Sequence, residues 1–261
     1  MSLYNAINGS NYTDPEAIQI TTIKGVLYLG MQNDISFLIS MVMSLYEQQS
    51  SFNPNMPLRM LQYVGNLYEK YTVENKLNKY GSTLLTLPVP KLVVFYNGTA
   101  EQPDEMILKL SDSFPPGVEG DVEVRVRMLN VNYGRNQKLL ETCRPLGEYA
   151  WLVEEVRKNK EQKGIESAID KAISDMPDDF VIKPFLMAHR SEVKGMLLTE
   201  YDEAEAMERF REDGWREGRL EGQLERAKQA ALNLLKMGKL TLSEIAESVG
   251  LSVSEVQKIA Y

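Results

Sequence analysis

The chain has 261 residues, of which 43% are hydrophobic and 25% charged, and its formal net charge is −8. These values exclude collagen-like, low-complexity and wholly disordered proteins, and the length allows one large or two modest domains. A single cysteine and a single histidine exclude a disulfide scaffold and a cysteine-based zinc site, and they leave little material for a histidine-rich metal site or a Ser-His-Asp triad. The acidity argues mildly against a protein that binds nucleic acid by bulk charge alone. Carboxylate chemistry, with or without a hard metal ion, is what remains.

Residues 1–150 predict a mixed α/β domain, because apolar runs of strand length surround one clear helical pattern. The expected helices are 2–8 and 57–71, and the expected strands are 18–23, 26–31, 34–39, 42–49, 91–96 and 122–131. No run of about 18 apolar residues and no signal-peptide pattern occurs in the sequence. We therefore expect a cytoplasmic protein with no membrane partner.

The remainder of the chain predicts helices almost throughout. We expect a helical extension packed on the first domain at 151–202, a charged helix at 203–235 and a helix-turn-helix-like hairpin at 236–261. Gly214, Gly218 and Gly222 recur every fourth residue, which indicates either a helix seam, as in a homodimer, or a poorly ordered helix. The helical hairpin at 236–261 carries three Lys and three Glu, so these charges sum to zero. A net charge of zero favours contact with a protein over sequence-specific binding to DNA.

The most informative stretch is residues 31–51, which predicts a β-hairpin that turns at Ser40-Met41. In that register facing residues have numbers that sum to 81, so Asp34 faces Glu47, and Gln49 shares their side of the hairpin. Two carboxylates this close must be solvated, protonated or bridged by a cation, and an all-oxygen site suits Mg²⁺. The ordinary interpretation is a pair of solvated acids at strand ends, and a slip of one residue would separate the pair.

Four segments in order carry a resemblance to a known family: GVLYLGMQNDISFLI, LYEQQSSFNPNMPLRMLQYVGNLYEKY, VVFYNGTAEQPDEMILKLSDSF and LNVNYGRNQKLLETCRPLGEYA. Together they resemble the Rpn family, recombination-promoting nucleases that are also described as transposase-like, within the PD-(D/E)XK nuclease superfamily. The similarity covers residues 1 to about 205. The final segment KMGKLTLSEIAESVGLSVSEVQKI is also similar to the usual end of that family.

The resemblance implies a metal-dependent DNA endonuclease with a restriction-endonuclease-like mixed sheet, an αβββαβ core and a helical C-terminal tail. It makes Asp34 and Glu47 the ligands of Mg²⁺ or Mn²⁺. Gln49 occupies the third motif position, usually Lys, where an amide can only orient water or phosphate by hydrogen bonding. The chain starts after most of the family's N-terminal helical segment, and Glu-Gln-Gln replaces the common Glu-His-Gln. A catalytically degenerate nuclease-fold protein, acting as a DNA-associated or regulatory module, is therefore the alternative.

Three further side chains are candidates for contacts with DNA. Arg59, on the helix that follows the hairpin, could reach a phosphate, and an exposed helix arginine is the alternative. Asn132 and Arg135 follow a predicted strand near the expected active edge, where an ordinary loop role is the alternative.

Overall fold

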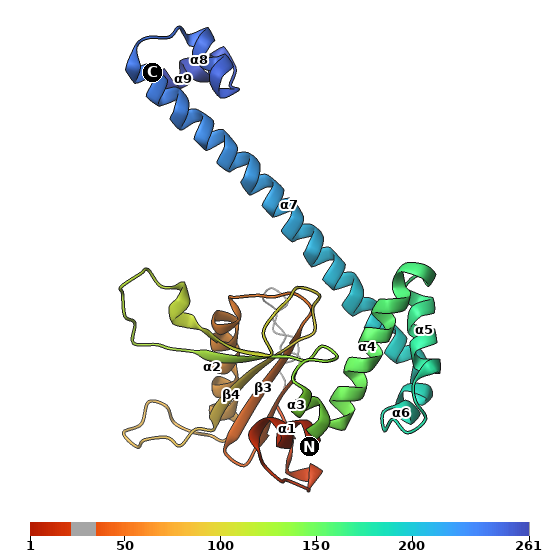
Figure 1. Cartoon of the computed structure of the whole chain (residues 1–261). Coiled ribbons are helices and arrows are strands. Elements are labelled where there is room, and N and C mark those ends of the chain that lie inside the picture. Colours follow the sequence, from red (N-terminus) through yellow and green to blue (C-terminus); the bar gives the residue numbers. More distant parts are fainter. Residues whose placement is uncertain (22–34, 261) are drawn as a thin grey trace. The chain divides into compact units, whose positions relative to one another are not determined.

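The structure is a computed structural model that describes residues 1–21 and 35–260 (Figure 1). Its internal contacts divide the chain into two compact units, Met1–Asp202 and Glu203–Tyr261. The division falls where the sequence predicts the end of the helical extension. The other expected boundaries, near residues 150 and 235, stay predictions.

The first unit contains a mixed sheet, for which the described residues give the strand order β1-β2-β3-β4-β6-β5. The three central strands β3, β4 and β6 are parallel, whereas β1–β2, β2–β3 and β5–β6 are antiparallel pairs. The helix α2 (Met56–Glu74) forms the crossover between β3 and β4 that a parallel pair requires. The strands are β1 (Gln19–Ile20), β2 (Ile35–Ile39), β3 (Val42–Gln49), β4 (Val89–Tyr96), β5 (Glu105–Lys109) and β6 (Arg125–Asn130).

Helices cover both faces of this sheet and continue through the rest of the chain. Two short 3₁₀ helices also occur: Pro15–Ala17 precedes β1, and Leu110–Ser113 follows β5. The α-helices are α1 (Ser2–Asn8), α2 (Met56–Glu74), α3 (Gln137–Thr142), α4 (Arg144–Lys163), α5 (Ile165–Asp175), α6 (Lys183–Ala188), α7 (Arg190–Met237), α8 (Leu242–Val249) and α9 (Val253–Ala260). No helix within residues 1–21 and 35–260 is long and apolar enough to cross a membrane.

The predicted hairpin register is confirmed in β2 and β3. Ile35 faces Tyr46 and Ile39 faces Val42, with the turn at Ser40-Met41. Ser40 adopts the left-handed backbone conformation, with φ 53°, that this tight turn requires. Asp34 and the expected strand 26–31 lie outside the described residues. Strand β5 has no counterpart in the sequence prediction.

Two apolar layers hold the sheet between its helices. On one face, α2 packs its buried side chains, including Met60 and Tyr63, against Met43 and Leu45 of β3. The other face packs against α1, α3 and the start of α4 through a second cluster. That second cluster contains Tyr4, Phe37, Ile39, Tyr46, Val93, Phe95, Leu129, Val131, Leu140 and Ala150. The central strand β3 is therefore buried on both faces.

The second unit has its own small core, built by the end of α7 with α8 and α9. The buried residues are Ala231, Ile245, Ala246 and Val256. A capping box between Thr241 and Glu244 starts α8, and the predicted turn follows its end. In α7, a Cβ built on Gly214, Gly218 or Gly222 would meet no atom of the described chain within 4 Å, so the homodimer seam stays a prediction.

Candidate functional site

Glu47 lies near the carboxyl end of β3, and its side chain is only 4% exposed. It belongs to the same face of the strand as Met43 and Leu45, because side chains alternate along a strand. The opposite face of the hairpin, with Ile39 and Tyr46, is also buried. Helix α2 covers the Glu47 face, so Glu47 is not the solvated strand-end acid of the ordinary interpretation.

The buried carboxylate of Glu47 is paired with the guanidinium of Arg59. The Nη2 atom of Arg59 donates to Oε1 of Glu47 at 2.5 Å and also donates to the hydroxyl of Tyr63 at 3.1 Å. Helix α2 starts seven residues after β3 and runs back along the sheet, so its first turn brings Arg59 over the strand end. A carboxylate at this depth requires such a partner, because an isolated buried charge is strongly unfavourable. The structure thus joins Arg59 to the predicted metal ligand, and its contact with DNA stays a prediction.

Gln49 occupies the next position on the same side of β3. Its Nε2 atom donates to the sulfur of Met56, at the start of α2, over 2.8 Å. A thioether sulfur is a weak acceptor, so a water or a phosphate oxygen could replace it at small cost. Glu47, Gln49 and Arg59 therefore form one polar group between the end of β3 and the first turn of α2.

A second polar group ties together the ends of β4 and β6, the other two parallel strands. Arg157 of α4 donates through Nη1 to Oδ1 of Asn132 at 2.6 Å, and through Nη2 to the carbonyl of Asn97. Asn132 in turn donates to the carbonyl of Gly98 at 3.0 Å. A Cβ on Gly98 would lie 2.1 Å from the carbonyl oxygen of Ser50, so glycine is required for this close approach. Arg157 was not predicted as a site residue, because it carries no local signal within a charged helix.

Arg135 belongs to neither of these groups. Its guanidinium pairs with Glu101 at 3.5 Å and with Asp104 at 3.8 Å, in the loop that leads into β5. Both are partly exposed ion pairs of the kind that contributes little to stability. A role for Asn132 and Arg135 in DNA binding stays a prediction.

The described part of the site supplies oxygen donors that a hard cation accepts. Glu47 offers a carboxylate and Gln49 an amide carbonyl, whereas Asp34, the second expected ligand, is outside the described residues. Across residues 1–21 and 35–260, no three His, Cys, Asp or Glu side chains are grouped closely enough to hold a metal ion. Carboxylate and amide oxygens are ligand types that Mg²⁺ and Mn²⁺ accept, and metal binding by Glu47 and Asp34 stays a prediction.

Comparison of the chain with protein-family models, with curated proteins and with solved structures gives no match. The established conclusion is a mixed α/β fold whose three central parallel strands end in polar side chains. In open α/β sheets, ligands bind beyond the carboxyl ends of the strands. The end of β3 is therefore the candidate functional site.

Proposed function

We propose that the first unit is a metal-dependent endodeoxyribonuclease of the Rpn type that hydrolyses phosphodiester bonds. Its biological setting would be recombination, mobile elements or defence. The observation that carries the proposal is Glu47, a carboxylate that is 4% exposed at the end of a central parallel strand. The helix–three strands–helix–strand order from α1 to β4 supports a restriction-endonuclease-like core.

The roles of the side chains follow from their chemistry. Glu47 and Asp34 would hold Mg²⁺ or Mn²⁺, which when bound lowers the pKa of a water and offsets charge on the phosphate. Gln49 can donate and accept hydrogen bonds and so can orient an attacking water or a phosphate oxygen. Arg59, which is 36% exposed, keeps a positive charge beside Glu47 and can turn toward a phosphate when another cation takes its place.

Nicking of supercoiled plasmid DNA by the purified full chain tests this proposal. We expect Mg²⁺-dependent cleavage that falls at least about 100-fold in Glu47→Gln and in Asp34→Asn, as the loss of a catalytic ligand requires. Glu119→Gln, which removes the same charge from an exposed loop, is the control and should cleave normally. Unchanged cleavage by a folded Glu47→Gln protein would refute the site assignment.

A second candidate is a nuclease-fold protein without catalysis that acts as a DNA-associated or regulatory module. The observation that favours it is the Glu47–Arg59 pair, in which the buried carboxylate is already neutralised by a side chain of the same unit. Calorimetric titration with Mn²⁺ separates the two candidates. The nuclease predicts binding that Glu47→Gln abolishes, and the second candidate predicts no carboxylate-dependent binding.

A further inference from the structure

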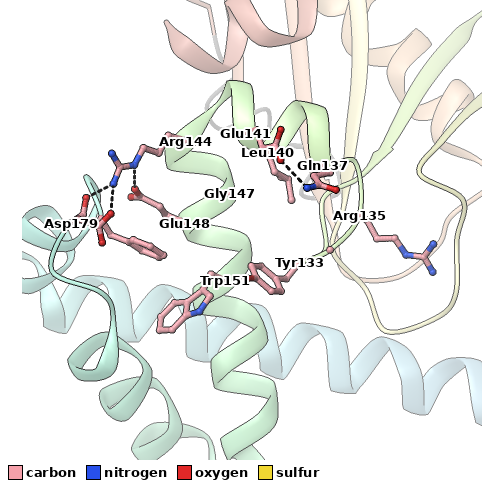
Figure 2. A pocket seen from close by; sticks show the side chains of 12 residues that line it. Tyr133, Arg135, Gln137, Leu140, Glu141, Arg144, Gly147, Glu148, Trp151 and Asp179 are labelled. Carbon is pink, nitrogen blue, oxygen red and sulfur yellow. Dashed lines mark hydrogen bonds and ion pairs between the residues drawn. The ribbon is translucent and has the colours of Figure 1, made fainter.

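A pocket of about 620 Å³ lies away from the Glu47 group, between α3, α4 and the segment that joins α5 to α6 (Figure 2). Its volume is in the range of pockets that enclose small organic ligands. None of Glu47, Gln49 and Arg59 lines this pocket. Its chemistry can therefore be considered independently of the nuclease proposal.

Three aromatic side chains line the pocket together with Leu140. Trp151 and Phe180 meet edge to face with ring centroids 5.4 Å apart, which fixes both rings. Tyr133 lines the same pocket and is 55% exposed, so its ring is available to a ligand. These rings come from three separate segments, and Figure 2 shows Trp151 and Tyr133 among the side chains around the opening.

One arginine stands between two carboxylates at the other side of the pocket. Glu148, only 4% exposed, accepts from Nε of Arg144 at 2.8 Å and from the backbone N–H of Ile182 at 3.0 Å. The Nη2 atom of Arg144 pairs with a carboxylate oxygen of Asp179 at 2.9 Å. One positive and two negative charges leave a net charge of −1 in this triad. Glu141 adds a further negative charge to the lining.

Arg135, the remaining charged residue of the lining, does not make the net charge of the pocket positive. Arg135 is directed to Glu101 and Asp104 in the adjoining loop, and Figure 2 shows its guanidinium turned away from the triad. Both arginines of the lining therefore have carboxylate partners, which neutralise their charges. Negative charge beside aromatic faces is the environment that attracts organic cations.

We propose that this pocket, which the rings of Tyr133 and Trp151 and the carboxylates of Glu141 and Asp179 line, binds an organic cation with a guanidinium or alkylammonium head. Attraction to the ring faces accounts for selection of an organic cation over Na⁺ or K⁺, which are strongly hydrated. The carboxylates account for selection against neutral molecules of the same shape. The cation can be a free small molecule or a basic side chain of a peptide.

Fluorescence of Trp151 reports on this pocket directly. The chain has two tryptophans, and the second, Trp215, lies in α7 and is 67% exposed, so W215F leaves Trp151 as the single emitter. The full-length W215F protein is titrated with N-acetyl-arginine amide and with its neutral isostere N-acetyl-citrulline amide, at constant ionic strength. We expect saturable quenching by the arginine compound at millimolar concentration or below, and binding at least tenfold weaker for citrulline.

Substitutions test the aromatic side and the acidic side of the pocket separately. Tyr133→Leu and Glu141→Gln should each weaken binding at least threefold, whereas Tyr133→Phe, which keeps the ring, should bind as the parent does. Asp112→Asn removes the same charge from an exposed turn and is the control for general electrostatics. Equal binding of the citrulline compound, or tighter binding of AMP than of the arginine compound, would overturn the proposal. So would an absence of saturable quenching, or equal weakening in Glu141→Gln and Asp112→Asn.

The two sources of the cation are separated in the same assay. Agmatine represents a free small molecule, and the peptide acetyl-Gly-Ser-Arg-Ser-Gly-amide represents a basic side chain in a protein. Tighter binding of agmatine assigns the pocket to a small molecule, and tighter binding of the peptide assigns it to a partner chain. Cleavage of plasmid DNA is unaffected by Tyr133→Leu under this proposal, so failure of the pocket and failure of the nuclease are distinguishable.

Discussion

Replacement of Arg59 by methionine should destabilise the first unit, because it removes the guanidinium that pairs with the buried carboxylate of Glu47. Removal of one member of a fully buried ion pair costs about 3–5 kcal/mol. Arg59 is 36% exposed, so water reaches the site and lowers that cost. Methionine retains packing along the aliphatic stem but loses the hydrogen bond to Tyr63, which is worth ~1 kcal/mol. We expect a net loss of about 2–3 kcal/mol in the free energy of unfolding.

Urea unfolding followed through Trp151 in the W215F protein measures this quantity for the unit that contains the pair. The double-mutant cycle with Glu47→Gln isolates the pairwise interaction, for which we expect a coupling energy of at least ~1 kcal/mol. Arg125→Met is the matched control, since Arg125 is an exposed arginine in the same unit, and its effect should stay within about 0.5 kcal/mol. A coupling energy indistinguishable from zero would refute the view that Arg59 neutralises Glu47.

The same variant also connects stability to the proposed metal site. Loss of the guanidinium removes the cation that competes for Glu47, so Mn²⁺ should stabilise Arg59→Met more than it stabilises the parent protein. A ligand at about 100 times its Kd adds ~2.7 kcal/mol to the free energy of unfolding. Stabilisation by Mn²⁺ that is equal in the two proteins, or that persists in Glu47→Gln, would contradict metal binding at this carboxylate.

Three further predictions concern pH and the second unit. A hydrogen bond from Arg127 lowers the pKa of Glu105 below its ordinary 4.5. The ionised pair should therefore add up to ~1 kcal/mol of stability above pH 4.5, and this contribution should vanish as pH falls through the lowered pKa. Urea titrations of the parent protein and of Glu105→Gln measure the difference. Burial raises the pKa of Tyr46 to about 12, so its ionisation lowers stability as pH rises from 10 to 12. Tyr46→Phe should reduce that loss, which circular dichroism detects, and change stability by no more than about 1 kcal/mol at pH 7. Gly250 ends α8 with φ 71°, so Gly250→Ala should cost about 1–2 kcal/mol, visible as faster hydrogen exchange of α8 amides, whereas Gly250→Asn should cost less.

Local sequence patterns were sufficient for the elements that surround the candidate site. The β2–β3 hairpin follows from alternation, and α2 follows from apolar residues at helical spacing with Pro57 in its first turn. Strand β5 was missed because Glu105–Lys109 is short, and its pattern emerges only when it pairs with β6. The helical extension expected over 151–202 is interrupted where α6 ends before His189, whose backbone leaves the helical conformation.

The candidate site was predictable only in part, because its members meet through tertiary structure. Glu47 and Gln49 were found from spacing along one strand. The pairing of Glu47 with Arg59 depends on how α2 folds back over β3, and the contact of Arg157 with Asn132 depends on where α4 begins. Burial of Glu47 was also beyond the local pattern, since a strand covered on both faces can place a charged residue on either.

The surroundings of Glu47 argue that stability alone does not explain its charge. Met43 and Leu45 precede it on the same face, and Met60 of α2 packs in the same cluster, so an apolar residue would fit this layer. Replacement of a buried ion pair by apolar residues of similar volume is often neutral or stabilising. A protein under selection for stability alone would have little reason to keep a carboxylate and a guanidinium here. The pair is accounted for if Glu47 must be able to exchange Arg59 for another cation, which is the exchange that the Mn²⁺ experiment measures.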